Sequence, residues 1–229
     1  MQSNEISDCA SYVHSLWGIA LKEELILQKI ILMRHAKTKG NQLKRYIGST
    51  DEHLCEEGII LATQCRKRRT YPQPDLLYVS PMKRCLETAH LLFPQAEPHI
   101  VNDLRETHFG DYENKSYEDL KDEKAYQTFL EYGGVTAFPN GESRGMVAER
   151  VLPAFDAIVT ELVAHPVPTC TLLVHGGTIM TILEHYAHPK KDYYHWQVEP
   201  CGGYLVCVDE TTWLTEKKLK VFKRFRGEF

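Results

Sequence analysis

The sequence predicts an α/β domain with an insertion, and three observations support this prediction. The 229 residues suit one such domain, or at most two small ones, and they can bury a sizeable core without covalent staples. Short apolar runs bounded by polar residues, at 29–33 and 169–174, are typical of buried parallel strands. Segments with apolar residues at helical spacing follow these runs. Ligands of such sheets bind at the carboxyl ends of the strands.

Composition and charge argue against several classes of protein. The apolar and charged fractions, 43% and 25%, are those of an ordinary globular protein, and the net charge of −4 disfavours nucleic-acid binding. No stretch approaches the roughly 18 consecutive apolar residues of a membrane span, and the N-terminus lacks the basic region of a secretory signal. Seven cysteines without a Cys-x-x-Cys pair indicate neither a disulfide framework nor a zinc ribbon. We therefore expect a cytoplasmic protein that contacts neither nucleic acid nor membrane.

Residues 1–24 form an N-terminal extension to a single domain at 25–229. Apolar residues recur at helical spacing in the extension, namely Ala10, Val13, Trp17, Ala20 and Leu21. An amphipathic helix there could cover an exposed patch or contact another subunit, so a homodimer is one expectation. A loosely ordered leader is the other, and both stay open.

Six segments of the domain carry strand signals. They are 25–33, 75–79, 99–101, 169–174, 202–208 and 218–225. The last is polar, and we expect it at an edge of the sheet that its basic residues protect.

Helices are expected between the strands. They follow residue 58, begin at 80, run over 143–164 and follow residue 175, with a short helical turn after 37. Ser80 reads as the N-cap of its helix and Pro81 as the first helical residue. In the helix after residue 58, one side should carry Ile59, Ala62 and Cys65.

Residues 107–145 read as an excursion from the sheet. This stretch is irregular and rich in glycine, asparagine, tyrosine and acidic residues. We expect a cap of one or two short helices and a loop, because long insertions in compact domains often form binding loops or lids.

Polar residues at the strand ends point to phosphoryl chemistry. Arg34 and His35 follow the first strand, Arg84 lies in the turn after the second, and His175 follows the fourth, with Glu106 after a weaker strand. Arginine presents paired donors that match phosphate oxygens. A neutral imidazole is a competent nucleophile near pH 7, and a carboxyl group can protonate a departing oxygen.

A metal site is the alternative for His35 and His175, and the sequence disfavours it. Neither a His-x-x-x-His pair on a clear helix nor a Glu-x-x-His cluster accompanies them, and two arginines would repel a dication. The nine other histidines show no comparable setting, although His108 is the least certain because it lies two residues from Glu106. They are His14, His53, His90, His99, His108, His165, His185, His188 and His195.

Four segments, in order, resemble the signatures of the histidine phosphatase, or phosphoglycerate mutase-like, superfamily. They are 32–41 (LMRHAKTKGN), 80–89 (SPMKRCLETA), 104–110 (LRETHFG) and 174–177 (VHGG), within a resemblance that runs from about Leu25 to Val208. The resemblance implies a three-layer α/β/α sandwich with a mostly parallel sheet and a small helical and loop cap.

The resemblance also implies roles for residues of this chain. His35 would take the phosphoryl group as a phosphohistidine, while Arg34, Arg84 and His175 would bind that group. Glu106 would protonate the leaving oxygen and then activate water. Donors from Asn41 and the amide of Gly176 would add to the site, and neither metal nor nucleotide cofactor is implied.

Two features bear on the branch of the family. Ala36 replaces the usual glycine, which should matter only if a positive φ is needed there. Lys37 and Thr38 stand where the mutases usually carry Glu-Ser, and the stretches 109–114 and 139–143 resemble the small phosphatases, including the α-ribazole phosphatase branch. This favours a phosphomonoesterase that acts on a small phosphorylated metabolite.

Two alternatives remain: a phosphoglycerate mutase-type phosphotransferase, and a non-catalytic protein on the same fold that binds phosphate esters. Four cations could ring the mouth of the site and favour a substrate with added negative charge, although a solvated loop explains them equally well. They are Lys37, Lys39, Lys44 and Arg45.

Overall fold

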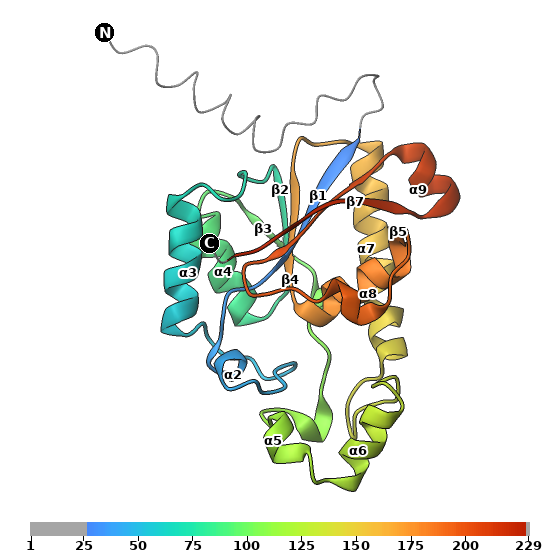
Figure 1. Cartoon of the computed structure of the whole chain (residues 1–229). Coiled ribbons are helices and arrows are strands. Elements are labelled where there is room, and N and C mark those ends of the chain that lie inside the picture. The colour runs from blue at the N-terminus through green and yellow to red at the C-terminus, as the bar shows by residue number, and fades with distance from the viewer. Residues whose placement is uncertain (1–26, 228–229) are drawn as a thin grey trace.

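The computed structural model describes residues 27–227, so the predicted helix of the N-terminal extension lies outside the described residues. One seven-stranded sheet crosses this part of the chain, in the order β3-β2-β4-β1-β6-β7-β5 (Figure 1). Its strands are β1 (Gln28–Arg34), β2 (Leu76–Val79), β3 (Pro98–Ile100), β4 (Cys170–Val174), β5 (Ala187–His188), β6 (Gly203–Val208) and β7 (Leu219–Phe225). All neighbouring pairs are parallel except those that β6 makes with β1 and β7.

Helices cover both faces of the sheet. The α-helices are α2 (Lys39–Gln42), α3 (Glu56–Lys67), α4 (Lys83–Leu92), α5 (Tyr117–Leu120), α6 (Lys124–Glu131), α7 (Arg144–Ala164), α8 (Gly176–Tyr186) and α9 (Glu210–Glu216). Short 3₁₀ turns are η1 (Asn102–Leu104), η2 (Gly110–Tyr112) and η3 (Tyr193–Trp196). In Figure 1, α3 and α4 lie on one side of the strands and α7 and α8 on the other, which confirms the predicted α/β/α sandwich. No helix within residues 27–227 is both long enough and apolar enough to cross a membrane.

The central strand β1 shows why residues 30–33 are all apolar. Ile30 and Leu32 pack with residues of α7, α8 and α9, whereas Ile31 and Met33 pack with residues of α3 and α4. Successive side chains of a strand point to opposite faces, so a strand covered on both faces must be apolar at every position. This is the physical basis of the strand prediction at 29–33.

Register in the sheet brings the strand ends together. Arg34 of β1 pairs with Val174 of β4, and the amide of His35 donates to the Val174 carbonyl over 3.0 Å. In the same way, the Ser80 amide donates to the Leu173 carbonyl over 3.1 Å after β2 ends. The residues that follow β1, β2 and β4 therefore meet at one edge of the sheet.

The cap lies beyond that edge (Figure 1). It holds α5, α6 and η2, and it has its own aromatic core of Tyr112, Leu120, Tyr126 and Phe129. The chain returns to the sheet through α7, which begins as predicted: Ser143 is its N-cap, and the Ser143 hydroxyl accepts from the Met146 amide over 3.1 Å.

The predicted start of α4 is wrong. Ser80 does not cap the helix, because its hydroxyl lies 2.6 Å from Nε2 of His175. Met82 is the N-cap instead and makes no side-chain cap bond, while the first helical amide, of Lys83, donates to Asp51 over 2.8 Å. A buried imidazole 95 residues away thus takes the hydroxyl that the local pattern assigned to the helix.

Two further expectations are corrected. Ile59 does not lie on the buried side of α3, since 44% of it is exposed; Gly58 takes that side with Ala62 and Cys65 and presses against the backbone of Lys37. The strand at 218–225 is not the outermost one, because β5 pairs with its first two residues. A two-residue strand is too short to show in a hydrophobicity pattern.

Candidate active site

His35 stands at the end of β1 and is 3% exposed. Its Nδ1 lies 2.6 Å from the carbonyl oxygen of Ala36. A carbonyl can only accept, so Nδ1 carries the proton and Nε2 keeps a free lone pair. Burial lowers the pKa of His35 well below its usual value, and the positive charges of Arg84 and Arg34 lower it further. The imidazole is therefore neutral and nucleophilic at Nε2.

Ala36 fits its position without strain. It is fully buried and is not among the residues with a positive φ, so glycine is not required there. Its amide donates to the hydroxyl of Thr88 over 2.9 Å, and that hydroxyl donates to the Arg84 carbonyl over 2.6 Å. The turn after His35 is thereby tied to α4.

His175 lies beside His35, with 5.2 Å between the ring centroids. Its Nδ1 accepts from Nε of Arg84 over 3.3 Å, and its Nε2 lies 2.6 Å from the hydroxyl of Ser80. Burial lowers the pKa of His175 well below its usual value, and the neighbouring Arg84 adds to this effect. Both ring nitrogens of His175 have hydrogen-bond partners in this state, so its contact with a phosphoryl group stays a prediction. The bond to Arg84 gives His175 a second role, which is to orient that guanidinium.

Arg84 is fully buried beneath the loop at 48–50. Its Nη1 donates to the Thr50 carbonyl and its Nη2 to the Gly48 carbonyl, each over 2.8 Å. No carboxylate of the described residues forms an ion pair with it. A guanidinium has five N–H donors, and three are used here, which leaves two for an anion.

Arg34 approaches the N-terminus of α8. Its Nη1 donates to the Val198 carbonyl over 2.8 Å, whereas its buried Nε has no hydrogen-bond partner among the described residues. A Cβ at Gly176 would lie 3.7 Å from that Nε. The amide of Gly176 begins the helix and therefore has no carbonyl of the helix to donate to. An unpaired guanidinium nitrogen beside a helix N-terminus is a good anion site.

Glu106 lies on the opposite side of the same helix start. Its carboxylate accepts from the amides of Gly177 over 3.0 Å and Thr107 over 2.9 Å. A Cβ at Gly177 would come within 2.3 Å of the carboxylate oxygen, so only glycine permits this approach. Glu106 as a whole is 9% exposed, and it lines the cavity described next.

One cavity of about 320 Å³ joins four of the predicted site residues. Arg34, Asn41, Glu106 and Gly176 all line it. The side-chain oxygen of Asn41 accepts from the Thr38 amide over 3.2 Å, which leaves its NH₂ group as the donor. His35, Arg84 and His175 are buried and are not among the residues that line this cavity.

The outer walls of the cavity contain residues that the sequence did not single out. Of the four cations expected at the mouth, only Arg45 lines it. Arg144 from the start of α7 lines it too, with its guanidinium 4.1 Å from the Tyr193 ring and 4.8 Å from the Tyr194 ring. No local pattern marks Arg144 or Tyr193, because segments far apart in the sequence bring them together.

Residues 27–227 contain no group of three or more His, Cys, Asp or Glu side chains arranged to hold a metal ion. His108, the least certain of the other histidines, accepts a bond from the Gly110 amide over 3.1 Å through Nδ1. It lines a second cavity that is considered below.

The two buried histidines predict a pH dependence of stability. The folded chain keeps His35 and His175 neutral, whereas in the unfolded chain each takes up a proton near pH 6.5. Stability is therefore full above about pH 6.5 and falls as pH decreases, by up to about 1.4 kcal/mol per pH unit for each histidine. Urea unfolding between about pH 7.5 and 5 measures this slope. His35→Gln should reduce the slope by about half, and a flat profile in both proteins contradicts the assignment.

Comparison with known proteins gives a consistent result. The model of the histidine phosphatase superfamily (branch 1) matches residues 30–218. A metal-independent phosphoserine phosphatase from Arabidopsis thaliana is 27% identical over 173 residues, which cover 72% of this chain and 71% of that protein. A 2,3-bisphosphoglycerate-dependent phosphoglycerate mutase from Nocardia farcinica is 22% identical over 189 residues, covering 68% and 76%.

A solved structure shares the fold. The α-ribazole phosphatase from Shigella flexneri superposes with a TM-score of 0.73 at 23% identity, over 87% of this chain and 96% of that one. The matched family segment contains β2, β4 and β1 from residue 30 on. It also contains the residues that follow these strands, where Arg34, His35, Arg84 and His175 lie. From this match, the chain belongs to the histidine phosphatase superfamily, branch 1.

Proposed function

We propose that this protein hydrolyses phosphomonoesters through a phosphohistidine formed on His35. The observation that carries the proposal is the bond from Nδ1 of His35 to the Ala36 carbonyl, which leaves Nε2 as a buried, neutral nucleophile beside two arginines. Relatives named as phosphatases support hydrolysis as the reaction.

The first step forms the phosphoenzyme. Nε2 of His35 attacks phosphorus, and the bond from phosphorus to the ester oxygen breaks. Arg34, Arg84 and the Gly176 amide neutralise the charge of the transferring group through donors that are free in this state. Glu106 in its protonated form gives its proton to the leaving oxygen.

The second step releases phosphate. Glu106, now a carboxylate, takes a proton from water, and the oxygen of that water attacks phosphorus. The bond from phosphorus to Nε2 breaks, which returns the neutral imidazole and inorganic phosphate. Every proton in this cycle is carried by Glu106, so no metal or nucleotide cofactor is required by the mechanism.

A direct test is a screen of phosphorylated metabolites and aryl phosphates, with and without chelator. We expect metal-independent release of phosphate from at least one ester. Inactivity across a broad panel with retained binding of phosphate would favour the alternative of a binding protein. Because relatives include phosphoglycerate mutases, a coupled isomerisation assay should accompany the screen. Isomerisation that outruns loss of phosphate to water would favour the mutase.

Arg144 in the cavity predicts that the enzyme prefers substrates with a negative charge besides that of the phosphoryl group. Arg144 forms no ion pair with a carboxylate of the described residues and donates only to the Gly133 carbonyl, over 3.1 Å. We propose that its remaining donors meet an anionic group of the substrate body. Arg144→Leu should then lower kcat/KM for a carboxylated phenyl phosphate by about 10–100-fold, the value of one charged hydrogen bond.

Unsubstituted phenyl phosphate is the matched control substrate, and it should lose much less. Lys124→Leu removes an exposed cation of the cap that does not line the cavity, and it should leave the ratio of the two substrates unchanged. Equal losses for both substrates in Arg144→Leu would contradict a role in charge recognition.

A further inference from the structure

The backbone of the segment that carries Glu106 is held by one partly buried arginine. Arg150 projects from α7, and its side chain is 10% exposed. Its Nη1 donates to the carbonyls of Asp103 and Arg105, each over 2.8 Å, and its Nη2 donates to the Glu106 carbonyl over 3.0 Å. Three carbonyls within four residues of irregular backbone thus converge on a single guanidinium.

Glu142 fixes Arg150 in turn. Its carboxylate accepts from Nε of Arg150 over 2.7 Å and from Nη2 over 2.8 Å, and the Glu142 side chain is 12% exposed. Burial raises the pKa of Glu142, but the bonds from Arg150 and from the His108 amide outweigh burial and hold the pKa below its usual value. A bidentate pair of this kind combines strength with a fixed geometry.

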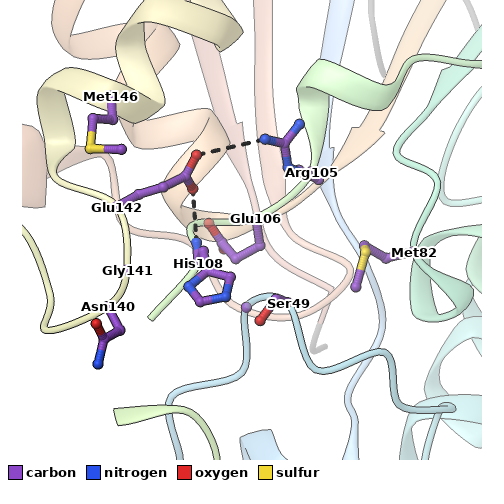
Figure 2. A pocket seen from close by; sticks show the side chains of 10 residues that line it. Ser49, Met82, Arg105, Glu106, His108, Asn140, Gly141, Glu142 and Met146 are labelled. Atoms are coloured by element: carbon purple, nitrogen blue, oxygen red, sulfur yellow. Dashed lines mark hydrogen bonds and ion pairs between the residues drawn. The ribbon is translucent and has the colours of Figure 1, made fainter. Parts of the chain in front are cut away.

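The Glu142 carboxylate also binds the other end of the segment, at His108. It accepts from the His108 amide over 2.8 Å, and the Glu142 amide donates to the His108 carbonyl over 2.8 Å. Figure 2 shows Glu142 between Arg105 and the backbone of His108, with Glu106 close by. Glu142 and Arg150 together therefore bracket Glu106 on both sides along the chain.

Close packing does not hold the segment on this side. A cavity of about 310 Å³ is lined by Arg105, Glu106, His108 and Glu142, as Figure 2 shows. On the other side, the Glu106 carboxylate accepts from the Gly177 and Thr107 amides and, over 3.4 Å, from the Thr107 hydroxyl. Beside this cavity, the backbone that aims the carboxylate is held by hydrogen bonds to the ion pair, and the Thr178 hydroxyl adds bonds to the Leu104 and Arg105 carbonyls over 3.4 and 3.3 Å.

We propose that Arg150, oriented by Glu142, is a positioning residue for Glu106, and that it sets the aim of the carboxyl group at the leaving oxygen. This inference rests on the proposed function, in which Glu106 is the general acid. Arg150 touches neither substrate nor transferring group in this arrangement. Its contribution to kcat/KM, which reports formation of the phosphoenzyme, should appear only where protonation of the leaving group matters.

The test compares two leaving groups in Arg150→Met. An alkyl alcohol departs only when it is protonated, whereas p-nitrophenolate departs without a proton. We expect kcat/KM for an alkyl phosphate to fall by about 100-fold, the usual effect of a misplacement near 1 Å, and that for p-nitrophenyl phosphate to fall by no more than about 3-fold. The readout is the ratio of kcat/KM for the alkyl phosphate to kcat/KM for p-nitrophenyl phosphate, because general damage to the fold lowers both values alike.

Two further variants complete the design. Glu142→Gln keeps size and packing but removes the charge that orients Arg150, so it should shift the ratio in the same direction; it also serves if Arg150→Met fails to fold. Asp156→Asn removes a different ion pair of α7, to Lys217 at 2.5 Å, and should leave the ratio unchanged. Thermal unfolding of each variant records the structural cost.

The outcomes are separable. A selective loss for the alkyl phosphate in Arg150→Met and Glu142→Gln supports the inference. Equal losses for both substrates, or no loss, overturn it while leaving the proposed function intact. If the unmodified protein hydrolyses no ester of the broad panel, the proposed function fails and the inference fails with it.

Discussion

Replacement of His35 by alanine is expected to abolish hydrolysis of every phosphomonoester that the protein accepts. The loss in kcat should be at least about 10⁴-fold, as for removal of other enzymic nucleophiles. In the proposed mechanism Nε2 of His35 forms the bond to phosphorus, and the neighbouring His175 is not expected to substitute because Arg84 and Ser80 occupy both of its ring nitrogens. Steady-state release of phosphate at saturating substrate measures the effect.

The control for this variant is an exposed histidine. His53 pairs with Glu87 and does not line the cavity, so His53→Ala should keep the activity. Thermal unfolding should show that His35→Ala is folded. Turnover by folded His35→Ala within about 100-fold of the unmodified protein would contradict the nucleophile assignment, because no second nucleophile is invoked.

Replacement of Glu106 by glutamine should produce the second largest effect. The amide has nearly the size of the carboxyl group but cannot give a proton to the leaving oxygen. We expect kcat/KM for an alkyl phosphate to fall by about 10²–10⁴-fold, the range of general acid catalysis. Esters of increasingly acidic alcohols should lose progressively less, because their leaving groups need less help from the acid.

A series of phosphate esters that spans alkyl and aryl alcohols tests this expectation. The dependence of log kcat/KM on the pKa of the leaving alcohol should be steeper in Glu106→Gln than in the unmodified protein. A uniform loss with unchanged slope would show that Glu106 contributes to binding or folding alone. In the same series of esters, the slope for Arg150→Met should lie between the slope of the unmodified protein and that of Glu106→Gln.

Much of the catalytic end of the site could be predicted because its information is local. A continuous apolar run marks β1, and the polar residues that end the run are Arg34 and His35. The same holds for β4 and His175. Once the strands are parallel neighbours, sheet register brings His35 and His175 together without further information.

What could not be predicted depends on partners distant in the chain. The Ser80 hydroxyl matches a helix cap by every local criterion, yet a buried imidazole needs it as a partner. Arg144 and Arg150 belong to a helix with a clear apolar stripe, and no local pattern distinguishes them from its other polar residues, although Arg144 lines the cavity and Arg150 holds the backbone of Glu106. The position of β5 follows from tertiary pairing with β7 alone.

The role of Gly176 came from family resemblance alone, whereas for Glu106 the pattern offered only a carboxyl group after a weak strand. Glu106 follows a three-residue edge strand, β3, whose residues are all exposed and carry almost no periodic signal. The structure supplies the reason for its place: the Gly177 amide and Arg150 hold it from opposite sides. This geometry could not be predicted from Glu106 and the residues next to it in the sequence.

The most direct test of the central claim is to trap the phosphoenzyme. The protein would be mixed with an excess of a rapidly hydrolysed ester and quenched in alkali within the first turnover, and the phosphorylated peptide would be located by mass spectrometry. We predict one phosphoryl group on His35, stable in alkali and lost in acid. A phosphoryl group on any other residue, or hydrolysis with no phosphoenzyme at any quench time, would contradict the account.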